Sequence, residues 1–201
     1  MTDRPWETEP TSLDFEADGL PCKMRRNAKW GTWCGYVGIG PEHPLYGLPF
    51  NHMLKLPASW FDGRKALQGV SPLDLFMHII SGAKSVDDPC PIRIALQVHG
   101  GCNYAEEADG RWWFGFDCGH AGDYLPYGDN VDKMLGEMVE SMPKEARATM
   151  RRIVNGERHG AVYRDQQYVV SECQSLAAQL NAIVKVITKE NTNGSPDRRG
   201  D

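Results

Sequence analysis

The 201-residue chain lacks three features that would each assign it to a class of protein. No apolar run approaches the roughly 18 residues needed to cross a bilayer, and the opening residues, MTDRPWETEP, have neither the basic region nor the apolar core of a secretion signal. Positive charge is also scarce, since 22 Lys and Arg stand against 27 Asp and Glu and give a net charge of −5. These two absences predict a cytoplasmic protein that neither enters a membrane nor binds nucleic acid non-specifically.

The third missing feature is a close pair of cysteines. The six cysteines are spread along the chain, no C-x-x-C occurs, and a chain of this length can bury a core without disulfide bonds. A thioredoxin-like redox pair is therefore not expected. We expect reduced thiols that pack as small apolar groups.

The distribution of apolar residues predicts one α+β domain between two flexible ends. Residues 1–24 are acidic and rich in proline, and residues 190–201 hold almost nothing that packs, so the first segment is expected to be flexible and the second disordered. Residues 25–189 are expected to form a single domain. Its predicted architecture is an antiparallel-rich sheet with a central hairpin, packed against helices that include a long C-terminal helix.

Two of these helices carry clear start signals. Ser71 is placed as an N-cap with proline at the first helical position, which predicts a helix over 71–81. Asp165 is placed as the N-cap of a second helix that continues to about Lys189, with apolar residues at helical spacing. We expect the apolar stripe of this second helix to pack on the core face of the sheet.

Three segments are predicted to form strands. Residues 30–39 combine aromatic and β-branched residues with three glycines, which is typical of a bent strand whose backbone is approached closely. Residues 92–98 alternate strictly between apolar and other residues. In residues 112–117, Trp112, Phe114 and Phe116 share one face, with Trp113 and Asp117 on the other. The Asp109-Gly110 pair between these last two segments is a strong hairpin signal.

This strand parity places chemically active side chains together. If the apolar sides of both strands face one core, His99 and Asp117 emerge on the other side. His120 and Asp123 follow in a Gly-flanked loop. All four side chains exchange protons or bind cations, so they are the candidate catalytic residues and the candidate metal ligands.

The surrounding residues widen the candidate binding site. Gly100 and Gly101 remove two side chains where the backbone would meet a ligand or form a bulge. His43 lies in a loop that could join the site, and Trp113 falls on the polar face, where it could stack on a ring. The candidate ligand-binding residues are His43, His99, Gly100, Gly101, Trp113, Asp117, His120 and Asp123.

This pattern fits several chemistries. It suits a mononuclear divalent metal, a general acid/base pair, or hydrogen bonding to a polar small molecule, and each residue taken alone also suits a structural role at a turn. A narrower hypothesis takes His99, Cys102, Cys118 and His120 as tetrahedral zinc ligands, although zinc hairpins usually have a tighter C-x-x-C knuckle.

Four separated blocks resemble a family of small proteins encoded by tailed bacteriophages and prophages. The blocks are GYVGIGPEHPLYG (35–47), VHGG with a following tyrosine (98–104), WWFGFDCGHAGD (112–123) and YRDQQYVVSECQSLAAQL (163–180). The resemblance implies a phage accessory gene expressed in the host cytoplasm, and it implies no reaction. Cys102 stands where the family pattern commonly has an aliphatic residue, which counts against the two-cysteine zinc site.

Two functions follow as hypotheses. In the first, the protein is a phage accessory protein of the anti-defence type, which interferes with a bacterial host system by binding a host protein or a nucleotide-like ligand through a polar pocket lined by His and Asp. In the second, the same residues hold a divalent metal that activates water, and the protein is a hydrolase of a phosphoester or a related small substrate. We prefer the first, because the carboxylates are few for a two-metal site and no phosphate-binding loop or nucleophile elbow occurs.

Overall fold

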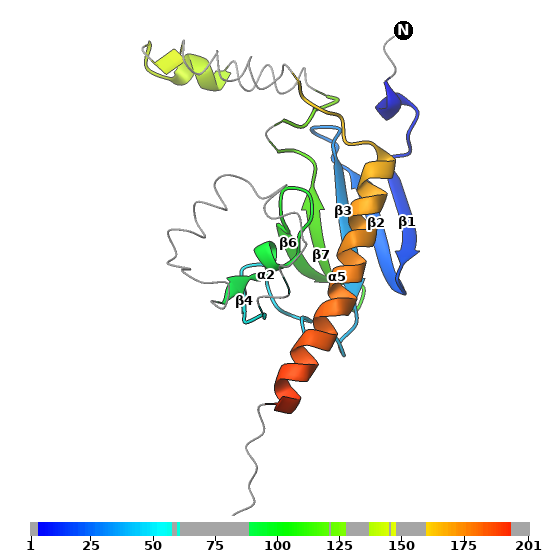
Figure 1. Cartoon of the computed structure of the whole chain (residues 1–201). Coiled ribbons are helices and arrows are strands. Elements are labelled where there is room, and N and C mark those ends of the chain that lie inside the picture. Colours follow the sequence, from blue (N-terminus) through cyan, green and yellow to red (C-terminus); the bar gives the residue numbers. More distant parts are fainter. Residues whose placement is uncertain are drawn as a thin grey trace, which may run out of the picture.

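The architecture was taken from a computed structural model, which describes residues 4–57, 60, 89–120, 122–127, 137–144, 146–147 and 160–193. A five-stranded antiparallel sheet carries the long helix α5 (Gln166–Asn193) along one face, so the predicted α+β fold is confirmed (Figure 1). The strands lie in the order β1 (Ser12–Ala17), β2 (Leu20–Arg26), β3 (Trp33–Ile39), β7 (Arg111–Asp117) and β6 (Tyr104–Ala108). The described part of the chain also contains the 3-10 turn η1 (Pro5–Glu7), the short pair β4 (Met53–Leu54) and β5 (Cys90–Pro91), and the single-turn helix α2 (Ile92–Ala95).

The core lies between the sheet and α5. Alternate side chains of β3 and β7 face the helix, and the stripe of α5 that meets them is fully buried, as the sequence predicted. These buried helix residues are Val169, Cys173, Leu176, Ala177, Leu180 and Ile183. The other sheet face carries the opposite residues of each strand, including Tyr36 of β3 and Asp117 of β7. The side chains of β3 and β7 therefore point either toward α5 or to this outer face of the sheet.

The start of α5 is capped from two directions. The Asp165 carboxylate accepts the Tyr168 N–H at 2.8 Å, which confirms the predicted N-cap. The Glu9 carboxylate accepts the Gln166 N–H at 3.0 Å and pairs with Arg26 of β2 at 2.8 Å. An acidic residue near the N-terminus thus fixes the beginning of the last helix.

The prediction that residues 1–24 form a flexible segment is wrong. Residues 12–17 are β1 and residues 20–24 belong to β2, joined by Asp18-Gly19 with φ of 48° and 76°. Positive φ at both central residues defines the type of two-residue turn that Asp-Gly favours, and Asp109-Gly110 repeats it between β6 and β7. The acidic residues of β1 are exposed on one side, while its alternating apolar residues pack on the core.

The predicted strand over 92–98 is also wrong. Its first four residues form α2, and the amides of Ile92 and Arg93 donate to His52 and Phe50 in a neighbouring loop. The residue between the alternating apolar positions, Ala95, is buried too. The apolar positions of this segment are thus buried without joining the sheet, and β6 takes the predicted place beside β7.

Two further predictions fall largely on residues that the structure does not describe. The helix over 71–81 lies outside the described residues. Of the predicted tail over 190–201, only 190–193 are described, and they form the end of α5, four residues beyond the predicted boundary. Within the described ranges, no helix is long and apolar enough to cross a membrane.

Gly35 of β3 is the position where the helix and the sheet meet most closely. A Cβ there would lie 2.6 Å from Phe116 Cζ and 2.8 Å from Cys173 Sγ. We predict that Gly35→Ala lowers the free energy of unfolding by about 1–3 kcal/mol because the core must shift to admit the methyl group. Urea unfolding measures this change.

Gly40→Ala is the matched control, since a Cβ there meets only the carboxylate end of the exposed Glu42 side chain. Equal urea midpoints for the two variants would contradict the close packing of α5 on β3.

Candidate functional site

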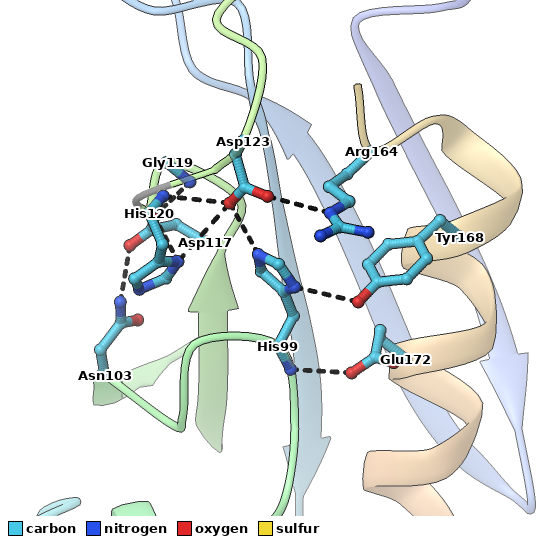
Figure 2. Close-up of polar contacts among 9 residues, drawn as sticks. All are labelled: His99, Asn103, Asp117, Gly119, His120, Asp123, Arg164, Tyr168 and Glu172. Carbon is cyan, nitrogen blue, oxygen red and sulfur yellow. Dashed lines mark hydrogen bonds and ion pairs between the residues drawn. The ribbon is translucent and has the colours of Figure 1, made fainter. Parts of the chain in front are cut away.

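Three separate segments of the chain bring polar side chains together beside the first turns of α5 (Figure 2). His99 comes from the loop after α2, and His120 and Asp123 come from the turn that follows β7. Arg164 precedes α5, and Tyr168 lies in its first turn. The predicted histidines and Asp123 are thus close in space, and backbone pairing of Asp123 with Val162 links the turn after β7 to the segment that precedes α5.

The Asp123 carboxylate is the centre of this cluster. Its Oδ2 accepts the His99 ring Nε2–H at 2.7 Å and the His120 backbone N–H at 3.0 Å, while Oδ1 accepts the Arg164 Nε–H at 2.9 Å (Figure 2). Only 1% of this side chain is exposed. Burial raises the pKa of Asp123, but the hydrogen bonds from His99 and Arg164 outweigh it and hold the pKa below its usual value.

Both ring nitrogens and the backbone N–H of His99 have hydrogen-bond partners. Its Nε2 faces Asp123, its Nδ1 lies 2.9 Å from the Tyr168 hydroxyl, and its backbone N–H donates to Glu172 Oε2 at 2.8 Å. With the proton on Nε2, Nδ1 accepts from the tyrosine hydroxyl. Burial and the nearby Glu172 charge raise the pKa of Tyr168 to about 12, so the hydroxyl keeps its proton.

His120 is packed but not fully bonded. Its ring occupies the space that a side chain at residue 100 would fill, since a Cβ on Gly100 would lie 2.0 Å from His120 Cε1. Gly100 also has φ +66°. The His120 Nδ1 is buried, has no hydrogen-bond partner, and lies 3.9 Å from Asp123 Oδ2 and 3.8 Å from Asp117 Oδ1.

Asp117 belongs to the outer side of the sheet. Its Oδ1 accepts the Gly119 N–H at 2.8 Å and its Oδ2 accepts the Asn103 amide at 2.6 Å. The prediction that His99 and Asp117 point to the same side of adjacent strands is wrong, because His99 is not in a strand and its carboxylate partner is Asp123. Asp117 is next to the cluster because its Oδ1 lies 3.8 Å from His120 Nδ1.

A pocket of about 450 Å³ opens on this outer face next to Asp117. Aromatic side chains, amides, a hydroxyl and a thiol line it together with the carboxylate of Asp117. The lining residues are Asn27, Trp30, Thr32, Cys34, Tyr36, Asn103, Tyr104, Phe116, Asp117 and Gly119. We call it the outer-face pocket. Of the four candidate catalytic residues, only Asp117 lines this pocket.

His43 does not join the cluster. Its Nδ1 accepts the Leu45 N–H at 3.1 Å, and its Nε2 therefore donates to the Leu180 carbonyl at 3.0 Å. Leu180 lies 12 residues beyond Tyr168, which is about 18 Å along the helix. Burial lowers the pKa of His43, so this side chain is a neutral structural bridge between a loop and α5.

Trp113 and the two cysteines are also outside the site. Trp113 is 4% exposed, its indole N–H donates to Ala108, and Lys23 covers its ring at 4.0 Å, so no face is open for stacking. Cys102 and Cys118 are buried, and burial raises the pKa of both thiols, that of Cys102 to about 12. Among the described residues, the group of side chains that could hold a metal ion contains neither cysteine, so the two-cysteine zinc site is not formed.

The described residues contain one group with the donor atoms for a metal ion. One atom from each of His99, His120 and Asp123 lies within 4.8 Å of the other two. This group could hold a metal ion, and it is a subset of the four candidate ligands predicted from the sequence.

Three residues that the analysis of the sequence missed complete the cluster. Arg164, Tyr168 and Glu172 follow one another at intervals of four, which places them on one face at the start of α5. This regular spacing of polar residues on a helix whose other face is apolar was the available signal. It was missed because only the apolar stripe was used to orient the helix.

Comparisons with known proteins identify no relative: no protein-family model, no curated protein and no solved structure matches this chain. The resemblance to phage proteins therefore stays a prediction. Function has to be argued from the geometry of the cluster and the outer-face pocket.

Removing the charge of Asp123 tests the centre of the cluster. We predict that Asp123→Asn lowers the free energy of unfolding by about 2–3 kcal/mol, because the buried amide cannot accept from both His99 and Arg164. Chemical denaturation gives this value. The matched control is Asp117→Asn at a side chain that is 40% exposed, where the loss should stay below about 1 kcal/mol. Equal losses at the two positions would show that Asp123 is not the centre.

Acid should weaken the fold through two carboxylates whose pKa values are lowered in the folded protein. Burial raises the pKa of Glu9, but hydrogen bonds from Gln166, Tyr163, Arg26 and Trp33 outweigh it, and Asp123 behaves likewise. Their contribution is complete above the ordinary values of 4.5 and 3.8, and it is lost as the pH falls through the lowered values.

We therefore predict that the free energy of unfolding of the native protein falls between about pH 6 and about pH 3 more steeply than that of Glu9→Gln. Denaturant titrations at a series of pH values measure both slopes. Parallel curves would contradict a lowered pKa of Glu9.

Proposed function

We propose that the protein is a phage accessory protein that binds a nucleotide-like ligand in the outer-face pocket and thereby interferes with a host system in the bacterial cytoplasm. The observation that carries the proposal is the composition of this pocket, in which aromatic rings stand beside hydrogen-bonding groups. The phage origin comes from the sequence resemblance alone.

The aromatic residues suit a flat ligand. Trp30, Tyr36 and Tyr104 line the pocket, and the two tyrosine rings pack edge to face with centroids 5.1 Å apart. Stacking of a base on such a side chain contributes about 1–3 kcal/mol whatever the base. A planar heterocycle therefore fits these rings better than a sugar or an aliphatic chain.

The polar residues suit the edge of a base better than a phosphate. Asp117, Asn103 and Asn27 line the pocket, and no Lys or Arg is among its lining residues. A carboxylate accepts N–H groups such as those on the edge of a base, and it repels phosphate. Lys29 lies outside the lining, with its Nζ 4.2 Å from the Trp30 ring centroid.

The cluster of His99, His120 and Asp123 holds the turn after β7, which contributes to one wall of the outer-face pocket. Asp117 and Gly119 line the pocket, and the next residue, His120, donates its backbone N–H to Asp123. The cluster thereby fixes the turn that follows β7 and sets the position of the Asp117 carboxylate. In this proposal His99 and Asp123 are positioning residues that do not touch the ligand.

Burial favours binding over the alternative of a metal-dependent hydrolase. The side chains of His99 and Asp123 are 9% and 1% exposed, which leaves little access for a substrate beside them. A hydrolytic site needs an open position for water and substrate next to these atoms. The concave shape of the outer-face pocket likewise favours a small ligand over a host protein.

The test is a titration with a panel of nucleosides, nucleotides and cyclic nucleotides, followed by thermal shift and by tryptophan fluorescence. We predict saturable binding of at least one compound, with a stabilisation of about 2.7 kcal/mol at a hundredfold excess over the dissociation constant. Asp117→Asn and Tyr104→Ala should each weaken binding at least tenfold.

Asp14→Asn is the matched control, because Asp14 is an exposed carboxylate on the same sheet face, outside the pocket lining. Binding that survives Asp117→Asn and Tyr104→Ala, or the absence of binding to any compound that carries a base, would refute the proposal.

A further inference from the structure

We infer that His99, His120 and Asp123 form a binding site for one divalent transition-metal ion of the Zn²⁺ type. The ligand atoms would be His99 Nε2, His120 Nδ1 and Asp123 Oδ2 (Figure 2). The site is separate from the outer-face pocket, and the inference does not depend on the proposed ligand.

The spacing around His120 indicates an ion. Its Nδ1 is 3.9 Å from Asp123 Oδ2 and 3.8 Å from Asp117 Oδ1, and both separations are too long for a hydrogen bond. Two tetrahedral ligands of one zinc ion, each about 2.0–2.2 Å from the metal, lie about 3.3–3.6 Å apart, so a shift of a few tenths of an ångström would bring His120 Nδ1 and Asp123 Oδ2 to that distance. The Nδ1 atom is buried with no hydrogen-bond partner, and an ion between it and the carboxylates would supply the missing partner.

His99 can present a lone pair to the ion by changing tautomer. If its proton moves from Nε2 to Nδ1, Nδ1–H donates to the Tyr168 hydroxyl oxygen across the same 2.9 Å. No net proton is lost in this step. A ligating histidine usually donates its other N–H to such a partner, which fixes the ring.

The Asp123 side chain can ligate through the oxygen that does not contact Arg164. Oδ1 stays bonded to Arg164, while Oδ2 turns from the His99 proton to the ion. The 2.7 Å separation of Oδ2 from His99 Nε2 has to open to about 3.3 Å, the distance between two ligands at a tetrahedral angle. This is a shift of a few tenths of an ångström on each side.

The local charge favours a cation. Asp117, Asp123 and Glu172 contribute three negative charges around the two histidines, and Arg164 contributes one positive charge. With neutral imidazoles the remaining two negative charges match a divalent ion. Two imidazoles and one carboxylate suit Zn²⁺ and its neighbours in the transition series, whereas Mg²⁺ and Ca²⁺ prefer oxygen ligands.

Asp117 lies beside the proposed ligand His120. Its Oδ1 is 3.8 Å from His120 Nδ1, and the same side chain lines the outer-face pocket. Binding of the ion would therefore hold His120 and Asp117 together and stiffen one wall of the pocket.

The experiment uses the full chain, stripped with a chelator and titrated with Zn²⁺ and Co²⁺. We expect one equivalent of Zn²⁺ to bind and to raise the melting temperature, with Mg²⁺ giving no shift. Bound Co²⁺ should show d–d absorption without a thiolate charge-transfer band, which separates this site from the cysteines. Absence of saturable Zn²⁺ binding, or a thiolate band, would overturn the inference.

Two variants locate the ion. His120→Asn removes a ligand and should weaken Zn²⁺ binding at least a hundredfold, whereas His52→Asn, at an exposed histidine far from the ligand atoms in sequence, should leave it unchanged. Tyr168→Phe keeps all three ligands and removes the group that orients His99, so it should weaken binding about 10–100-fold. Wild-type affinity in both His120→Asn and Tyr168→Phe would assign the ion to another place.

Discussion

The arrangement of this protein's polar site depends on one buried carboxylate. Asp123 is almost inaccessible to water, and its two oxygens accept hydrogen bonds from a histidine after α2, an amide in its own turn, and an arginine before α5. A buried charge is costly unless such partners surround it, so the fold is committed to holding these three segments at one point. The turn after β7 and the start of α5 are thereby set relative to each other.

A second, partly buried carboxylate secures the other side of the same helix end. Glu9 accepts from the first amide of α5, pairs with Arg26 of β2 and bonds to the Tyr163 hydroxyl. The chain just before α5, which carries Tyr163 and Arg164, is thus bound to Glu9 on one side and to Asp123 on the other. These two attachments hold the residues at the start of α5 in fixed positions relative to the sheet.

The sequence predicts the parts that local rules control. The Asp165 cap and the apolar stripe of α5 were identified correctly because capping and helical periodicity act over a few residues. The Asp109-Gly110 hairpin followed from turn chemistry, and the same signal at Asp18-Gly19 was overlooked because the acidic composition of the segment was given more weight.

What sequence could not supply was which alternating segment joins the sheet and which histidine is structural. Residues 92–98 alternate like a strand, but their amides bond to a loop some forty residues away, which no local pattern encodes. The residues that flank His43 and His99 in the sequence do not reveal the role of either side chain. Only tertiary packing places the first against the Leu180 carbonyl and the second between a carboxylate and a tyrosine.

The central claim is that Asp123 couples the start of α5 to the turn that follows β7. Amide hydrogen exchange of the His120 N–H in an Arg164→Gln variant tests it most directly, because this amide donates to the same carboxylate but never contacts Arg164. The account predicts faster exchange at His120, with the Gly119 amide, which donates to Asp117, unchanged as an internal reference. Identical exchange of the His120 amide in the variant and the native protein would contradict it.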